Sequence, residues 1–130
     1  MIADELEKYL TLKRSSLFET IDFSFLTEIS ELFQNRKSSP GEILFDPSRD
    51  RAALYIIQEG GLVDDAGIAY KSIVGVKDIL LMHFENKNFN RKLLSGSEGC
   101  ILYAADGRSF MDLIQEIPEI AAQFISLREN

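Results

Sequence analysis

Several residue types are scarce in this chain, and each scarcity excludes a class of protein. The 130 residues include one cysteine and one histidine, so an internal disulfide is impossible and a metal site built from several such ligands is excluded. Basic residues are also few, with 14 Lys and Arg against 21 Asp and Glu and a net charge of −7. A chain this acidic does not attract nucleic acid or an anionic membrane surface. No apolar run approaches the roughly 20 residues that a membrane helix needs.

The remaining composition is typical of a globular protein, with 45% hydrophobic and 27% charged residues. The length suits one domain that covers residues 1–130. The first ten residues are acidic where a signal peptide is basic, and the single cysteine gives no sign of an oxidising compartment. We therefore predict one cytoplasmic domain that binds neither nucleic acid nor membrane.

Hydrophobic periodicity divides the chain into three parts. Residues 2–35 follow a helical period, residues 37–105 form short β-rich runs separated by turns, and a helical period returns over residues 107–128. No helix alternates with the strands, as it would in a parallel sheet. The order predicts an α+β fold, in which an antiparallel β-roll of the jelly-roll type is flanked by N-terminal and C-terminal helices.

Local signals place the ends of these elements. Ser24 is the expected N-cap of a helix whose apolar face includes Ile29, and the basic pair Arg36 and Lys37 suits the negative end of that helix. Glycine-rich segments at 59–61 and 95–99 predict turns that end strands, and residues 64–67 predict a hairpin. Strands are expected at 42–45, 54–57, 62–63, 68–70, 72–76, 92–94 and 100–104, and helices from Ser109 and from Pro118.

Three segments, taken in order, resemble the cyclic nucleotide-binding domain, the β-roll module of catabolite-activator transcription factors and of protein kinase A regulatory subunits. The first is similar to the entry helices, the second to the first strand pair with its spacing from Gly41 to Tyr55 to Gly60, and the third to the hinge helix and terminal helix. These segments are Leu12–Phe18 with Phe25, Leu26 and Leu32; Gly41–Phe45 with Leu54–Ile57 and Gly60; and Phe110, Leu113, Ile114 and Pro118–Ala121. The resemblance implies a non-enzymatic regulatory module.

The resemblance also implies a phosphate-binding cassette near residues 76–94. In the family a Gly-Glu pair opens a short helix whose backbone amides hold the cyclic phosphate, and an arginine further on neutralises its charge. Here Lys77 occupies the place of the glycine, Asp78 that of the glutamate, and Arg91 that of the arginine. The implied ligand-binding residues are Lys77, Asp78, Ile79, Leu80, Arg91 and Lys92.

Two hypotheses about function follow from this cassette. A lysine side chain in the glycine place obstructs the close approach of backbone to phosphate. This favours a degenerate pocket that is filled by side chains such as Lys92 or Leu93. The module would then act through protein contacts. In the alternative, Arg91 and the amides after Asp78 bind cAMP or cGMP, and the terminal helix moves on binding. Residues 71–92 hold five basic residues against two acidic ones, and this local positive charge is compatible with an anionic ligand.

The other chemistry-bearing residues have simpler interpretations. His83 lacks further metal ligands, so we predict no metal and no cofactor besides the possible cyclic nucleotide. Cys100 lies in an apolar run, which is typical of a buried structural thiol. No set of nucleophile, base and orienting group emerges, so we predict no enzyme. An apolar stripe with Phe124 and Leu127 in the last helix could bind a protein partner or a second copy of the chain.

Overall fold

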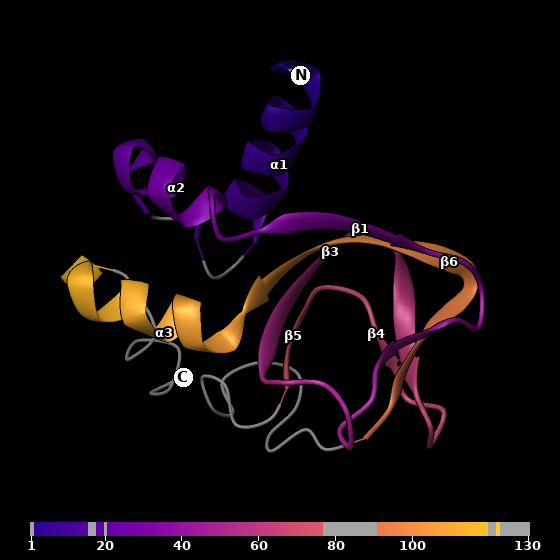
Figure 1. Cartoon of the computed structure of the whole chain (residues 1–130). Coiled ribbons are helices and arrows are strands. Elements are labelled where there is room, and N and C mark those ends of the chain that lie inside the picture. Colours follow the sequence, from indigo (N-terminus) through magenta and orange to yellow (C-terminus); the bar gives the residue numbers. More distant parts are fainter. Residues whose placement is uncertain (1, 16–17, 20, 77–90, 120–121, 123–130) are drawn as a thin grey trace.

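A computed structural model describes residues 2–15, 18, 19, 21–76, 91–119 and 122 of the chain, and Figure 1 shows its arrangement. Two helices lead into an antiparallel sheet of long curved strands, and a third helix follows the sheet. The elements are α1 (Ile2–Arg14), α2 (Phe23–Ser30), β1 (Gln34–Ser38), β2 (Ile43–Phe45), β3 (Ala53–Asp64), β4 (Ala69–Tyr70), β5 (Ile73–Val76), β6 (Leu93–Asp106) and α3 (Gly107–Glu116). The predicted α+β β-roll between helices is confirmed.

Strands β3 and β6 are the two long members of the sheet, and every other strand pairs with one of them. β6 pairs with β1, β2 and β3, while β3 also pairs with β4 and β5. All of these pairs are antiparallel. The two long strands curve along their length (Figure 1), so the sheet bends into a roll.

The two glycine-rich segments that we expected to end strands lie inside β3 and β6. The register of these strands shifts between Ile57 and Glu59 and again between Gly60 and Leu62, which marks bulges in a continuous ladder. Gly60 and Gly99 both have φ +80°, and a Cβ on Gly60 would overlap the carbonyl oxygen of Gly99. The glycines therefore allow two strands to bend together in close contact, and the turns predicted at 59–61 and 95–99 are wrong.

The boundary between the helices and the sheet also differs from the prediction. α2 ends at Ser30, and residues 34–38 form β1, so Arg36 and Lys37 lie on a strand and not at a helix end. The N-cap residue of α2 is Asp22 in place of Ser24, and its side chain makes no capping hydrogen bond. The sequence of β1 is polar and does not alternate between apolar and polar residues, so hydrophobic periodicity does not indicate a strand there.

The helix expected from Ser109 is confirmed as α3. It begins two residues earlier, because the side chain of Asp106 accepts a hydrogen bond of 3.0 Å from the backbone N–H of Ser109 and so caps the first turn. Most of the helix expected from Pro118 lies outside the described residues. None of the described helices is long and apolar enough to cross a membrane.

Two hydrophobic cores lie on opposite faces of the sheet. The first joins the helices to the sheet, and the rings of Phe18, Phe33 and Phe110 meet edge to face in it with centroids 6.0–6.1 Å apart. The second fills the inside of the roll and is made of Leu44, Phe45, Tyr55, Leu62, Tyr70, Val74, Val76, Leu93, Cys100 and Leu102. The inner core therefore reaches both the hairpin after β3 and the start of β6, where the candidate site lies.

Candidate functional site

The predicted ligand-binding residues fall into two groups in the structure. Lys77, Asp78, Ile79 and Leu80 lie outside the described residues, as does His83. Arg91 and Lys92 are described, and they immediately precede β6, which begins at Leu93. The structure therefore locates the predicted arginine, and the groups around it can be identified.

Arg91 faces a carboxylate that the sequence analysis treated only as a turn residue. Its Nη1 lies 3.4 Å from Oδ2 of Asp64, the last residue of β3. The side chain of Arg91 is 50% exposed, whereas that of Asp64 is 0% exposed. The arginine thus covers a buried carboxylate from the solvent side.

Asp64 is buried because of its position in the strand and is held by the hairpin that follows. Burial alternates along the end of β3, so Asp64 lies on the same inward face as Leu62. Its Oδ1 accepts hydrogen bonds of 2.9 Å from the backbone N–H groups of Ala66 and Ile68. Its Oδ2 accepts one of 2.9 Å from the hydroxyl of Tyr70. With Arg91, four donors converge on one carboxylate.

This arrangement keeps Asp64 negatively charged. Burial acts to raise the pKa of its carboxyl, but the hydrogen bonds from Ile68, Tyr70 and Ala66 and the charge of Arg91 outweigh burial and lower the pKa below its usual value. The chain therefore places an ionised carboxylate against Arg91. The arginine that the resemblance assigns to a ligand phosphate has an anionic partner within the chain itself.

The residues after Arg91 differ from each other in where they lie. Lys92 is exposed, so its side chain does not fill the roll. Leu93 is fully buried in the inner core and pairs with Asp64 across the β3–β6 ladder and with Phe45 across the β2–β6 ladder. An apolar side chain therefore occupies the inside of the roll directly beside the Arg91–Asp64 pair.

The sequence analysis missed Asp64 and Tyr70 as residues of this site. One signal was available, because Asp64 follows Leu62 at the two-residue spacing of an inward-facing strand position. The hairpin itself was predicted at 64–67 and is confirmed by the β3–β4 pairing. Aspartate is common at turns, so its position at the start of a hairpin does not by itself indicate a buried carboxylate.

Cys100 is a buried thiol and carries no sign of reactivity. It lies in the inner core, and burial raises its pKa to about 11, which disfavours the reactive thiolate. Within the described ranges, no group of three or more His, Cys, Asp or Glu side chains could hold a metal ion. The apolar stripe with Phe124 and Leu127 lies outside those ranges.

Comparisons with known proteins agree with this architecture. No family model and no curated protein matches the chain. A candidate cyclic nucleotide-binding protein from Geobacter metallireducens has a similar structure, with a TM-score of 0.70, 12% identity, and coverage of 89% of this chain and 88% of that one. The regulatory domain of Toxoplasma gondii PKA, solved with cAMP, has a TM-score of 0.62 and 23% identity, with coverage of 85% of this chain and 44% of that one.

A mutant of CooA from Carboxydothermus hydrogenoformans is also similar, with a TM-score of 0.61 and 14% identity over 91% of this chain and 78% of that one. These proteins differ from one another and share little sequence with this chain, so the likeness concerns the backbone architecture. The chain has the fold of the cyclic nucleotide-binding domain superfamily.

Proposed function

We propose that this chain is a non-enzymatic regulatory module in which the nucleotide position of the fold is closed, and which acts through protein contacts. The observation that carries the proposal is the ion pair between Arg91 and the buried Asp64. In the family that the chain resembles, the matching arginine neutralises a phosphate. A phosphate that approached Arg91 here would meet the negative charge of Asp64 and repel it.

Two further features support a closed position. Asp64 keeps three donors besides Arg91, so releasing the arginine to a ligand would leave the carboxylate buried and still charged. Leu93 packs in the inner core beside the pair and places an apolar side chain there. The guanidinium is half exposed, so a ligand that approaches it from solvent would have to compete with Asp64 for Arg91.

A surface suited to protein contact lies on the first two helices. Leu6, Leu10 and Phe23 are 55%, 41% and 61% exposed, and the ring of Phe23 lies 5.5 Å from that of Tyr9. We call Leu6, Tyr9, Leu10 and Phe23 the helical patch. It belongs to the two helices that lie on one side of the roll (Figure 1). Exposed apolar side chains grouped in this way are typical of an interaction surface.

The charge around the helical patch favours one kind of occupant. Glu5, Glu7 and Asp22 are exposed near it, against the exposed cation Arg14 one turn after Leu10. Two copies of this acidic surface would repel each other, whereas a segment that presents apolar side chains among lysines or arginines would be attracted. We therefore expect a partner protein with a basic amphipathic segment, and a monomer in the absence of that partner.

Calorimetric titration of the full chain with cAMP and with cGMP tests the closed position. We expect no saturable heat at millimolar nucleotide and no rise in melting temperature. A ligand held at a hundredfold excess over its Kd would instead stabilise the fold by about 2.7 kcal/mol. Such a rise, lost in Arg91→Gln but kept in Arg108→Gln, would overturn the proposal.

The same titration decides the second candidate, a working cyclic nucleotide sensor. One observation favours it: Arg91 is half exposed and its contact with Asp64 is long, at 3.4 Å, so the guanidinium can turn toward a ligand. In that case Asp64→Asn, which removes the competing charge, would bind cAMP more tightly than the wild type. If neither protein binds, the sensor hypothesis fails.

The helical patch is tested with a lysine-leucine amphipathic peptide, and a glutamate-leucine peptide of the same pattern serves as the control. We expect the lysine peptide to shift amide resonances of α1 and α2 in an NMR titration and the acidic peptide to leave them unchanged. Leu10→Ser should abolish the shifts without lowering the melting temperature, because Leu10 is exposed. Equal shifts from both peptides would contradict the charge argument.

A further inference from the structure

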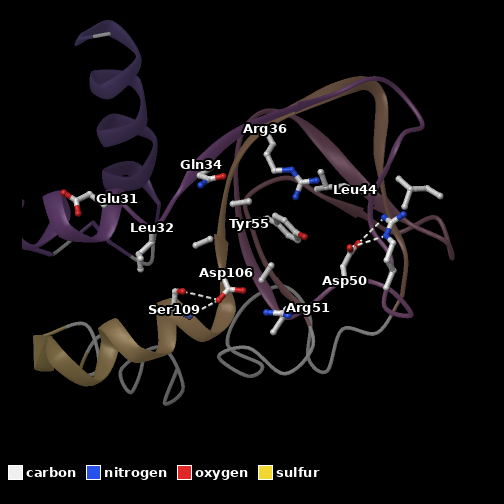
Figure 2. A pocket seen from close by; sticks show the side chains of 16 residues that line it. Glu31, Leu32, Gln34, Arg36, Leu44, Asp50, Arg51, Tyr55, Asp106 and Ser109 are labelled. Carbon is white, nitrogen blue, oxygen red and sulfur yellow. Dashed lines mark hydrogen bonds and ion pairs between the residues drawn. The ribbon is translucent and has the colours of Figure 1, made fainter.

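A second group of arginines lines an open cavity that does not include Arg91 or Asp64. The cavity has a volume of about 520 Å³ and is bounded by β1, β3, β6, the segment between β2 and β3, and the start of α3. Figure 2 shows its lining side chains. Cavities of this size accommodate small organic ligands, so the chemistry of the walls indicates what this one can bind.

Two arginines enter the cavity from different walls. Arg36 lies on β1 opposite Leu102, which is buried in the inner core, so its side chain extends from the inner face of the sheet. Arg51 lies on the segment between β2 and β3. In Figure 2 the ring of Tyr55 lies between these two side chains. Two guanidinium groups and one hydroxyl therefore border the same space.

The carboxylates of the cavity already have partners. Both oxygens of Asp50 bind Arg49 at 3.2 Å, and one of them also accepts the backbone N–H of Asp46. Asp106 caps α3 through Ser109. The side chain of Glu31 points away from both Arg36 and Arg51 in Figure 2.

Arg36 and Arg51, which we call the open arginines, have no carboxylate partner among the residues that the structure describes. Across the described residues the ion pairs are Arg49–Asp50 and Arg91–Asp64, so neither Arg36 nor Arg51 forms one. Each guanidinium keeps donors for an anion from outside the chain.

The hydroxyl of Tyr55 completes this set as a neutral donor. Burial raises the pKa of Tyr55 to about 12, in spite of the opposing effect of the Arg36 guanidinium. The hydroxyl therefore keeps its proton at any ordinary pH and can donate a hydrogen bond to an anion. The side chains of Leu44, Ala53 and Ala104 add an apolar wall to the cavity.

The geometry points to a second ligand site in this cavity, for a small organic molecule that carries a phosphate group. Guanidinium forks match phosphate oxygens in pairs, and a phosphate has enough acceptors to engage two arginines and a tyrosine together. A bare phosphate would leave much of 520 Å³ empty, and the apolar wall suits the organic part. This cavity does not include Arg91 or Asp64, so the proposed second site does not depend on the proposal that the nucleotide position is closed.

An NMR titration of the full chain with inorganic pyrophosphate tests the site, with sodium chloride at equal ionic strength as the control. We expect saturable shifts at amides of residues 34–36, 51–55 and 104–106 and smaller ones elsewhere. The double variant Arg36→Gln with Arg51→Gln should weaken binding about a hundredfold or more, because it removes the charged hydrogen bonds of two arginines. Tyr55→Phe should weaken it severalfold.

Arg108→Gln is the matched control, since Arg108 is exposed on α3 and does not line the cavity. It removes one positive charge from the surface and should change the affinity by less than about twofold. An equal loss in Arg108→Gln would show general attraction of anions and overturn the site. Absence of saturable shifts, shifts centred on Arg91, or equal affinity for succinate would also overturn it.

Discussion

Arginines at two places in the roll differ in what faces them. Arg91 lies against Asp64, a fully buried carboxylate held by three further donors. Arg36 and Arg51 border a cavity whose aspartates bind other groups. A charge that is neutralised within the chain stabilises the fold, whereas a charge left open is available to a ligand. The comparison therefore separates an arginine of the architecture from arginines of a binding site.

The bend in β3 lies between these two places along the strand. Tyr55 belongs to the cavity and Asp64 to the closed position, and Gly60 lies between them in close contact with Gly99. The glycine pair lets one strand contribute to both places. A change at the bend should therefore affect the whole roll, and changes on either side of it should have local effects.

The largest effect is expected for Gly60→Ala. The new methyl would overlap the Gly99 carbonyl oxygen at φ +80°, so the two strands must separate, and we expect a loss of about 3 kcal/mol or more in the free energy of unfolding. Gly41→Ala is the control, because Gly41 has φ +79° and no heavy atom near its Cβ position. It should cost about 1–2 kcal/mol. Equal losses in urea denaturation would mean that the close contact is unimportant.

Asp64→Ala comes next. It removes a buried carboxylate that accepts hydrogen bonds from Tyr70 and from two backbone N–H groups, which should lower the free energy of unfolding by about 2–3 kcal/mol. Asp65→Ala changes the neighbouring exposed aspartate and should stay within about 0.5 kcal/mol. If thermal denaturation gives the same result for both variants, Asp64 is not the structural centre of the hairpin.

The lowered pKa of Asp64 makes its contribution dependent on pH. A carboxyl with a lower pKa in the folded state than in the unfolded chain stabilises the fold above the unfolded value of about 3.9, and this contribution is lost as the pH falls through the folded value. The stability difference between wild type and Asp64→Asn should therefore be full at pH 6–7 and shrink below about pH 4. A difference that does not change with pH would show that Asp64 is not ionised in the fold.

The architecture could be predicted from the sequence because its signals are local. Apolar spacing and turn residues indicated the hairpin at 64–67, the strand that ends at Phe45 and the helix near Ser109, and the structure confirms all three. The bends at Gly60 and Gly99 could not be distinguished from turns. A turn and a bulge use the same residue type, and only the neighbouring strand shows which of them forms.

The candidate site was predicted less completely because it depends on contacts between distant segments. Arg91 was singled out from its resemblance, but its partner lies 27 residues earlier in the chain. Arg36 was assigned to a helix end, since β1 has no apolar alternation and the partner of Arg36 in the sheet, Leu102, lies 66 residues later. Spacing along the chain does not reveal which side chains face each other across a roll.

The smallest expected effects compare the arginines themselves. Arg91→Gln removes one donor and the countercharge from a buried carboxylate, but the arginine is half exposed, so we expect a loss of about 1 kcal/mol in urea denaturation. Arg36→Gln and Arg51→Gln break no ion pair with a described carboxylate and should each stay within about 0.5 kcal/mol. The ranking of the variants should reverse for pyrophosphate binding. Arg36→Gln and Arg51→Gln should weaken binding, and Arg91→Gln should leave it unchanged. A variant set in which stability and binding change together would mean that the two places form one site, because a fold-stabilising arginine and a ligand-binding arginine differ only in whether the chain supplies the anion.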